Sequence, residues 1–274
     1  MTKTHLLSLL PLCLLCCCSL LFAQEGPAYK GTKELYEKQY TVTQKHGKNV
    51  TTLSATLSGE YDAEGNLIFA RKQKGNKTYM GYIRKNISSN PPTVETVEYN
   101  HMNQIGVRKL ETTDPQNGDS TIIEYDAKGK ILAKTSIRHH KDSLWTMEYN
   151  QVGYISRYYQ SVMDSTNKVS ERLVYDYADE LKELHTYLYD SSDLLIAIVA
   201  FNQEHEVIGI TEYVYDDRGN CTEEKHYKDE DTITSSIQYQ YDAKDRMILR
   251  SEYKWNPRFG TYPQLQRMFE YSYK

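Results

Sequence analysis

Residues 125–130 read Tyr-Asp-Ala-Lys-Gly-Lys, and this stretch decides the fold because the chain repeats it. It ends a run in which Thr121, Ile123 and Tyr125 would share one face of a strand. Further strong copies begin at Tyr61-Asp62, Tyr215-Asp216 and Tyr241-Asp242. Repetition of one short unit is the signature of a repeat architecture, in which each unit buries its apolar side by stacking on its neighbours.

Weaker copies of the motif fill the intervals between the strong ones. They begin at Tyr99-Asn100, Tyr149-Asn150, Tyr175-Asp176, Tyr189-Asp190 and Phe201-Asn202. The motif recurs about every 26 residues over most of the chain, and about twice as often between Tyr175 and Tyr215. The full unit therefore consists of two similar halves, each with one strand and one turn. Short strands at this spacing indicate an all-β protein.

The polar residues of the motif predict a tight hairpin turn. Asp or Asn at the first turn position accepts a hydrogen bond from the backbone N–H two residues on, and Gly three residues later adopts a positive φ. The expected turn-forming residues are Asp62, Gly65, Asp126, Gly129, Asp216, Gly219 and Asp242. Asp245 takes the glycine position in the last strong copy, because Asp also tolerates a positive φ.

Strands joined by these turns predict an all-β fold, an antiparallel meander of repeated β-hairpins that forms an elongated, twisted or curled sheet. Alternation in residues 145–149 and 237–241 places aromatic and aliphatic side chains on one face and polar ones on the other. Residues 194–201 are apolar throughout, so we expect a strand buried on both faces. Residues 268–273 alternate as a closing strand.

The first 23 residues are typical of a signal peptide. Lys3 precedes an uncharged apolar run from Leu6 to Phe22, and we expect cleavage after Ala23 and export to the periplasm or the exterior. A membrane anchor is a rival interpretation, but the run is short for a spanning helix. A lipoprotein is a second rival, because the run contains Cys13, Cys16, Cys17 and Cys18. It is disfavoured because none of these cysteines follows Gly, Ala or Ser, as a lipid-attachment site normally requires.

Removal of the signal leaves Cys221 as the single cysteine, so the exported chain has no internal disulfide and depends on its core and its strand ladders. We expect Cys221 to be a small strand residue and not a reactive thiol. Residues 24–50 lack the repeat and form a lead-in, in which the charged segment Lys33–Lys38 is a helical turn or extended. The repeat domain spans residues 51–274.

Composition limits the partners. The chain has 25 Tyr and only 5 Phe, which suits partly buried sheet positions where the ring packs and the hydroxyl stays in water. A net charge of −4 gives no case for nucleic acid, which calls for a strongly basic face. The mean hydropathy of −0.70 includes the apolar signal, so the mature chain is more polar still. The basic run over residues 71–85 is interpreted as a solvated strand surface, with an anionic-ligand site as the alternative.

No arrangement in the sequence points to catalysis, a metal ion or a cofactor. His139 and His140 are neighbours on an expected strand and would point to opposite faces. The chain contains no Gly-x-Ser-x-Gly, His-Glu-x-x-His or P-loop motif. The turn aspartates suggest calcium, but their place in the hairpin explains them, and the dense Asp/Gly pattern of a calcium-binding solenoid is missing. We therefore do not expect an enzyme.

The series of Tyr-Asp-x-x-Gly copies between Tyr61 and Arg246 resembles the YD repeats of the RHS family. It resembles even more the short secreted bacterial proteins that are built from such repeats. In large RHS and toxin-shell proteins these repeats form sheets that spiral into a cocoon around a toxin, and glycan-binding and cell-surface roles are proposed for the family. This chain is too short for such a cocoon and lacks the Asp-Pro-x-Gly-Leu motif. The resemblance therefore implies the sheet architecture, without encapsulation.

Aromatic residues near strand ends offer the best indication of a ligand site, since sugar rings stack on aromatic side chains. The candidates are Trp255, Tyr253 and Tyr227, together with Tyr158 and Tyr159, and cross-strand packing is the alternative for each. Trp255 ranks first because it lies in an insertion with Pro and Gly, and loops tend to carry function.

We expect a secreted, non-catalytic binding or structural module at the cell envelope or surface. Its partner would be a glycan or an envelope protein, bound through the sheet face or the edge strands. The alternative is an envelope enzyme or an inhibitor accessory protein with an unrecognised active site.

Overall fold

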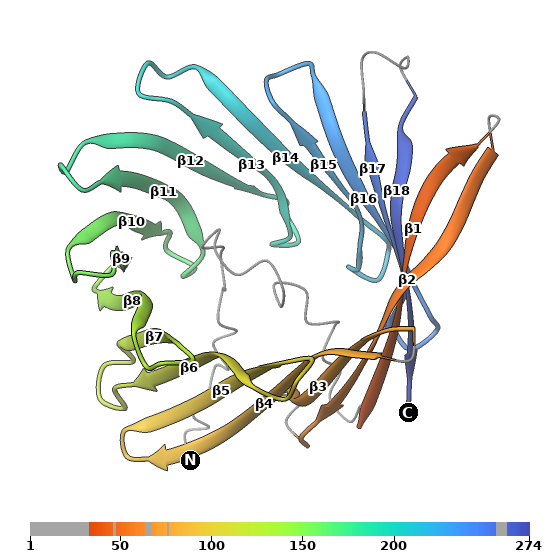
Figure 1. The fold of residues 1–274 in the computed structure, drawn as a ribbon. Helices are drawn as coiled ribbons and strands as arrows, with labels where there is room; N and C mark the ends of the chain where they lie inside the picture. Colours follow the sequence, from red (N-terminus) through yellow and green to blue (C-terminus); the bar gives the residue numbers. More distant parts are fainter. Residues whose placement is uncertain (1–32, 46–47, 64–66, 76, 256–261) are drawn as a thin grey trace, which may run out of the picture.

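In the computed structural model the chain forms a closed β-barrel (Figure 1). The structure describes residues 33–45, 48–63, 67–75, 77–255 and 262–274, so the predicted signal peptide, residues 1–23, lies outside the described residues. The described residues form 18 strands, which pair antiparallel in chain order, and β1 pairs with both β2 and β18. Each described strand therefore has two hydrogen-bonded neighbours.

The strands of the N-terminal half are β1 (Glu34–Lys45), β2 (Lys48–Tyr61), β3 (Leu67–Lys74), β4 (Lys77–Ser89), β5 (Pro92–Asn100), β6 (Ile105–Thr113), β7 (Ser120–Asp126), β8 (Ile131–His140) and β9 (Ser143–Tyr149). Those of the C-terminal half are β10 (Ile155–Met163), β11 (Val169–Asp176), β12 (Leu181–Tyr189), β13 (Leu195–Phe201), β14 (Val207–Tyr215), β15 (Cys221–Tyr227), β16 (Ile233–Tyr241), β17 (Met247–Lys254) and β18 (Gln264–Tyr273). Among the described residues there is no helix long and apolar enough to cross a membrane.

The all-β antiparallel meander is confirmed, but the expected elongated, twisted or curled sheet is wrong because the ring closes. Strand β1 closes it: Leu35 pairs with Tyr273 of β18 on one side and with Gly59 of β2 on the other. The segment Glu34–Lys45 is extended and part of the ring although it lacks the repeat motif. With both neighbours in place, the described strands offer no free edge for the predicted binding by strand addition.

One turn geometry recurs at both rims of the barrel. At the turn of Asp126, the Oδ1 atom accepts hydrogen bonds from the backbone N–H groups of Lys128 (2.8 Å) and Lys130 (2.9 Å), and Gly129 has a φ of 79°. The same carboxylate or amide bonds form at Asn100, Asn150, Asp164, Asp176, Asp190, Asp216 and Asp242. Gly65, in the turn after Asp62, lies outside the described residues.

A β-bulge follows many of these turns. Tyr125 pairs with Ile131 and Glu124 with Ala133, so Leu132 is an extra residue in β8. Several bulge residues are exposed aliphatic side chains, namely Ile68, Leu132, Ile196, Ile208 and Ile248. A bulge bends its strand and increases the local twist. Repeated in successive hairpins, it favours the curvature that a closed ring requires.

Strand register divides the wall into two faces. Arg71, Gly81 and Tyr99 pair across β3, β4 and β5, and we call the face that carries them the groove face. Ala70 and Tyr82, which pair beside them, lie on the opposite face. The face on which a motif tyrosine lies depends on the rim of the barrel at which its strand ends. Those that end odd-numbered strands lie on the groove face (Tyr99, Tyr125, Tyr149, Tyr175), and those that end even-numbered strands lie on the opposite face (Tyr61, Tyr189, Tyr215, Tyr241).

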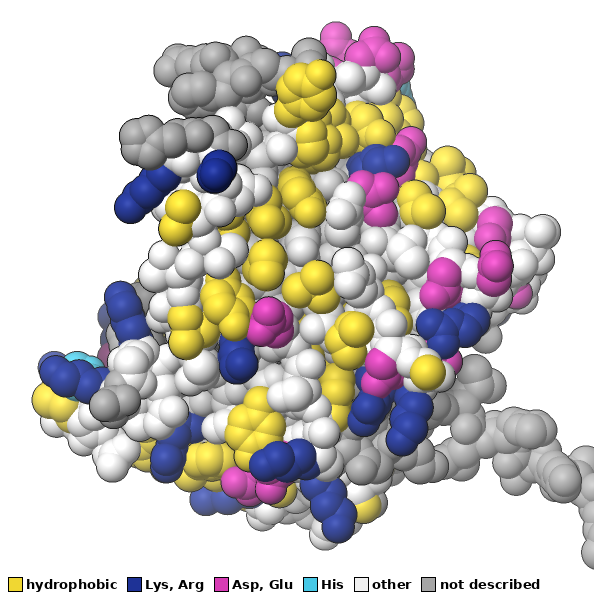
Figure 2. Space-filling model, turned by 90° about the vertical axis from the view of Figure 1, so that its right-hand side faces the viewer, with side chains coloured by type: hydrophobic (Ala, Val, Ile, Leu, Met, Phe, Trp, Pro, Cys, Tyr) yellow, Lys and Arg dark blue, Asp and Glu magenta, His cyan; other side chains and the backbone are white. Residues whose placement is uncertain are grey.

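The expectation of one apolar and one polar face is therefore wrong. Register places residues 145–149 on the groove face with their aromatic side chains, and it places the aromatic residues of 237–241 on the opposite face. Figure 2 shows the consequence on one side of the molecule, where hydrophobic side chains alternate with charged ones. Each face is thus mixed in character around the ring.

The buried core lies on the opposite face, where the ring closes. It consists of Leu35, Tyr61, Leu67, Ala70, Tyr82, Phe269 and Tyr271. The apolar strand β13 is not buried on both faces as expected, because its residues are half-buried and Ile196 is 39% exposed. A wall made of one sheet has no second layer to cover either face.

Candidate functional site

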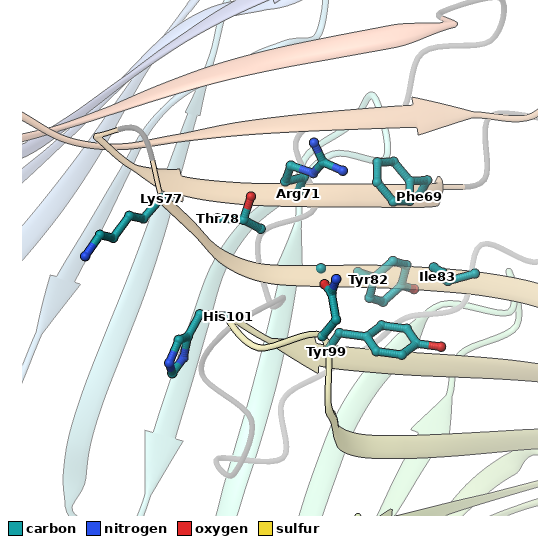
Figure 3. Close-up of a pocket in the computed structure, with 10 residues that line it drawn as sticks. Phe69, Arg71, Lys77, Thr78, Tyr82, Ile83, Tyr99 and His101 are labelled. Atoms are coloured by element: carbon teal, nitrogen blue, oxygen red, sulfur yellow. The ribbon is translucent and has the colours of Figure 1, made fainter.

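A groove with a volume of about 600 Å³ lies over β3, β4 and β5. Figure 3 shows the side chains around it, which include Phe69, Arg71, Lys77, Ile83, Tyr99 and His101. Pockets that bind small ligands commonly have volumes of roughly 300–1,000 Å³. The groove is therefore large enough for one small ligand or for one unit of a polymer.

Strand pairing builds the groove. Phe69 and Arg71 are two residues apart on β3 and therefore share a face. Ile83 pairs with Phe69, and Gly81 pairs with Arg71 on one side and with Tyr99 on the other. Because Gly81 carries no side chain, the space between Arg71 and Tyr99 stays open. A Cβ atom at position 81 would lie 3.8 Å from the Cβ atom of Tyr99.

The groove is basic. Arg71, Lys77 and His101 line it, and none of the described residues that line it carries a carboxylate. The guanidinium carbon of Arg71 lies 5.7 Å from the centre of the Phe69 ring, within the range of a cation–π contact. A cation–π contact uses the face of the guanidinium group, whose N–H donors lie in the plane of the group. The arrangement can attract and hydrogen-bond an anionic group.

A carboxylate on the same face is neutralised by its own partners. Glu95 is 8% exposed, and its carboxylate lies 3.0 Å from the Lys85 ammonium and 2.6 Å from the Arg108 guanidinium. The hydrogen bond from Lys85, followed by that from Arg108, lowers the pKa of Glu95 against the effect of burial. Glu95 therefore stays ionised and engaged with these two cations.

Register splits the basic run of residues 71–85, which the sequence presents as one segment. Arg71 and Lys77 line the groove. Lys72 lies on the opposite face, where burial raises the pKa of Glu37 and the charge of Lys72 offsets a part of that rise. Lys85 pairs with Glu95. The groove thus contains part of the run together with Tyr99 and His101 from beyond it, a combination that the sequence analysis missed because no local signal sets the register of β3 to β5.

The structure places Tyr227, Tyr253 and Trp255 around the first half of β16, away from the groove. Tyr253 of β17 pairs with Ser236 of β16, and register places Tyr227 of β15 on the same face. The backbone N–H of Trp255 donates to the carbonyl of Thr234 at 3.0 Å. The three aromatic residues are therefore near neighbours. Residues 256–261, which follow Trp255, lie outside the described residues.

The Tyr227 hydroxyl donates a hydrogen bond to Glu212 Oε2 at 2.9 Å. Burial, and then this bond, raise the pKa of Tyr227. The hydroxyl is thus held in cross-strand packing, which was the alternative interpretation for this residue.

The other aromatic candidates pack within the wall. Tyr158 is stacked between Trp145, at 5.7 Å between ring centres, and Tyr175, at 4.7 Å. Both faces of its ring are occupied, so a sugar has no free ring face to stack on. Tyr159 lies on the opposite face and donates to Glu148 at 3.0 Å. Burial raises its pKa to about 12.

A buried charged cluster ties together the strands that close the ring. Arg250 of β17 is 4% exposed and bonds to Glu252, and its guanidinium carbon lies 4.2 Å from the centre of the Phe269 ring on β18. Glu37 of β1 is 3% exposed, and burial raises its pKa. Burial also raises the pKa of Tyr271, which bonds to both Glu37 and Arg250. This cluster acts structurally, because its groups are engaged with one another across the seam.

The remaining candidates for chemistry are dispersed. His139 Nδ1 lies 3.5 Å from Asp119, and His185 Nε2 lies 2.9 Å from Glu183. Within the part of the chain that the structure describes, no group of three or more His, Cys, Asp or Glu side chains could hold a metal ion. Cys221 is half-buried, and burial raises the pKa of its thiol to about 11.

Fold and site together define a closed β-repeat barrel that carries a basic, aromatic groove on its wall. No family model and no curated protein matches the chain. Among solved structures it is similar to a porin-like protein from Bacteroides uniformis ATCC 8492, at 10% identity and a TM-score of 0.34, over 90% of this chain and 98% of that one.

The chain is also similar to TcdB2-TccC3 without its hypervariable C-terminal region, at 15% identity and a TM-score of 0.24. This match covers 78% of this chain and 13% of the other. At these TM-scores neither likeness carries an argument about function.

Proposed function

We propose that the protein is a secreted, non-catalytic binding module of the cell envelope or cell surface, which recognises a glycan or an envelope protein through side chains on its barrel wall. The groove over β3 to β5 carries the proposal, since it combines basic and aromatic side chains in a hollow of ligand size. Closure of the ring supports it, because paired strands leave side chains as the means of recognition.

Charge on both faces of the wall supports a role in water. Arg108 and Lys134 lie within strands on the groove face, and Arg172 and Arg250 lie within strands on the opposite face. A cationic residue facing lipid at the bilayer midplane costs about 2–4 kcal/mol. Whichever face were turned to lipid, it would carry such residues. These charges support the proposal of an aqueous compartment, which the predicted signal peptide would let the chain reach.

A binding screen tests the proposal. The mature chain from Gln24 is titrated with immobilised glycans and envelope fractions, beside the groove variant Arg71→Ala/Lys77→Ala and the variant Trp255→Ala. Lys128→Ala/Lys244→Ala is the matched control, because it removes the same charge from two exposed turns outside the groove.

Saturable binding that is lost in the groove variant and kept in the control is the expected result. Binding that only Trp255→Ala abolishes would move the site to β15–β17. A wild-type chain that binds nothing in the screen would overturn the binding function.

A further inference from the structure

We infer that the groove binds an acidic sugar unit, meaning a saccharide ring that carries a carboxylate. This inference rests on the proposed binding function and narrows the class of ligand. It follows from the way polar and apolar side chains are distributed along the groove.

One end of the groove is basic. Figure 3 shows Lys77 and His101 on one side of the groove, with Arg71 between them and the aromatic end. Lys77 begins β4 and His101 follows β5, so both come from the same rim of the barrel. A guanidinium group binds a carboxylate through two parallel hydrogen bonds, and an ammonium group adds a point charge. A carboxylate at this end would be matched in both charge and geometry.

The other end is apolar and aromatic. Phe69 and Ile83 pair across β3 and β4, and Tyr99 lies on the next strand beyond Gly81. Figure 3 shows the rings of Phe69 and Tyr99 at this end. A sugar ring presents C–H groups on one side, and these pack on aromatic surfaces as other apolar groups do. The open position at Gly81 leaves room for a ring between Arg71 and Tyr99.

Neutral hydrogen-bonding groups complete the site. Thr78 and Asn103 also line the groove, and both present side chains that donate and accept hydrogen bonds. Asn103 is fixed in the rim turn with a φ of 57°. Sugar hydroxyls need partners of this kind when they are removed from water.

Simpler ligands use only part of this lining. An inorganic anion would bind at the basic end and leave the aromatic end uncovered. A neutral sugar would cover the aromatic end and leave Arg71 and Lys77 without a counter-charge. The acidic sugar is the ligand class that engages both ends together.

Calorimetric titration of the mature chain tests the inference with three probes: a glucuronate-containing oligosaccharide, a neutral glucose oligosaccharide of equal length, and inorganic phosphate. We expect the acidic oligosaccharide to bind at least tenfold more tightly than either of the others. Arg71→Ala is expected to weaken its binding at least tenfold and to leave the neutral probe unchanged.

A steric variant separates the groove from the rest of the surface. Gly81→Leu fills the open position without a change of charge, and its Cβ atom meets only an ordinary contact. Gly106→Leu is the matched control, since Gly106 is also a strand glycine and lies outside the groove. A Cβ atom added there would lie 3.6 Å from the carbonyl oxygen of Glu98, again an ordinary contact. We expect Gly81→Leu to abolish binding of the acidic probe and Gly106→Leu to preserve it.

Four results would each overturn the inference. The first two are that the neutral probe or phosphate binds as tightly as the acidic probe. The others are that the acidic probe does not bind at all, or that it binds Gly81→Leu as well as the wild type. The experiment also distinguishes failure of the acidic-sugar assignment from failure of the proposed binding function. If the chain binds another envelope component that Gly81→Leu does not affect, the acidic-sugar assignment fails while the binding function stands.

Discussion

Substitution of Gly129 by Val tests the turn that builds the barrel. Gly129 has a φ of 79°, and a Cβ atom added there would meet nothing within 4 Å. The substitution therefore creates no steric clash with the surroundings. Its cost comes from the backbone alone, because L-residues with a branched Cβ resist a positive φ.

The size of the effect follows from this geometry. A non-glycine residue in the left-handed region costs about 1–2 kcal/mol, and a β-branched residue lies at the upper end. For a domain of this size each kcal/mol lowers the melting temperature by roughly 2–4 °C, so Gly129→Val should lower it by roughly 2–8 °C. Gly129→Asn should cost less, since Asn occupies the equivalent turn position at Asn103 and Asn167 with φ of 57° and 62°.

Thermal unfolding followed by circular dichroism at neutral pH measures the three proteins side by side. The expected order of melting temperature is wild type, then Gly129→Asn, then Gly129→Val. A Val variant that melts with the wild type would refute the left-handed turn. An Asn variant as unstable as the Val variant would show that space, and not backbone conformation, sets the cost.

Arg250→Ala removes the buried cation that bonds to half-buried Glu252, and it should cost about 3–5 kcal/mol in urea unfolding. The control Arg267→Ala removes an exposed partner of the same carboxylate and should cost about 1 kcal/mol or less, and equal losses would contradict the buried network. The hydrogen bond from Arg246 lowers the pKa of Asp242 to about 2, so its stabilisation is complete above the unfolded value of about 4 and is lost as the pH falls toward 2. The stability difference between wild type and Asp242→Asn should therefore shrink over that interval, and a constant difference would argue against the assignment. The raised pKa of Cys221, about 11, predicts slow reaction with iodoacetamide at pH 8 and at least tenfold faster reaction in urea, whereas equal rates would show an accessible, activated thiol.

The turns could be predicted from the sequence because their cause is local. The side chain of Asp126 bonds to backbone groups two and four residues on, and Gly129 supplies the positive φ within the same six residues. Strand positions followed from the spacing of these turns. The same reasoning applies to the copies at Asp216 and Asp242.

Closure of the ring could not be predicted in this way. It depends on the summed curvature of many bulged hairpins and on β1, a strand without the motif that fits between β2 and β18. The alternation of Tyr125 and Tyr215 between faces was missed for a related reason, since it depends on which rim each turn occupies.

The groove was missed because its residues come together only through register. Arg71, Gly81 and Tyr99 lie on three successive strands, and the sequence does not show that these three positions pair with one another. The sequence analysis named Tyr227, Tyr253 and Trp255 because each lies near a strand end. That they are neighbours depends on the register of β15 to β17, which the sequence alone does not set.

Disulfide trapping across β1 and β18 tests the closed ring on which the site depends. Lys38 pairs directly with Glu270, so their Cα atoms are about 4.5–5.5 Å apart, which is within the range of a disulfide. The test variant is therefore Lys38→Cys/Glu270→Cys in a Cys221→Ser background. Lys38→Cys/Leu249→Cys is the control, because Leu249 pairs with the far side of Glu270 and is one strand further away. The closed barrel predicts rapid intramolecular cross-linking in the first pair and little in the second. An open or curled sheet, with β1 and β18 apart, would give no cross-link in either.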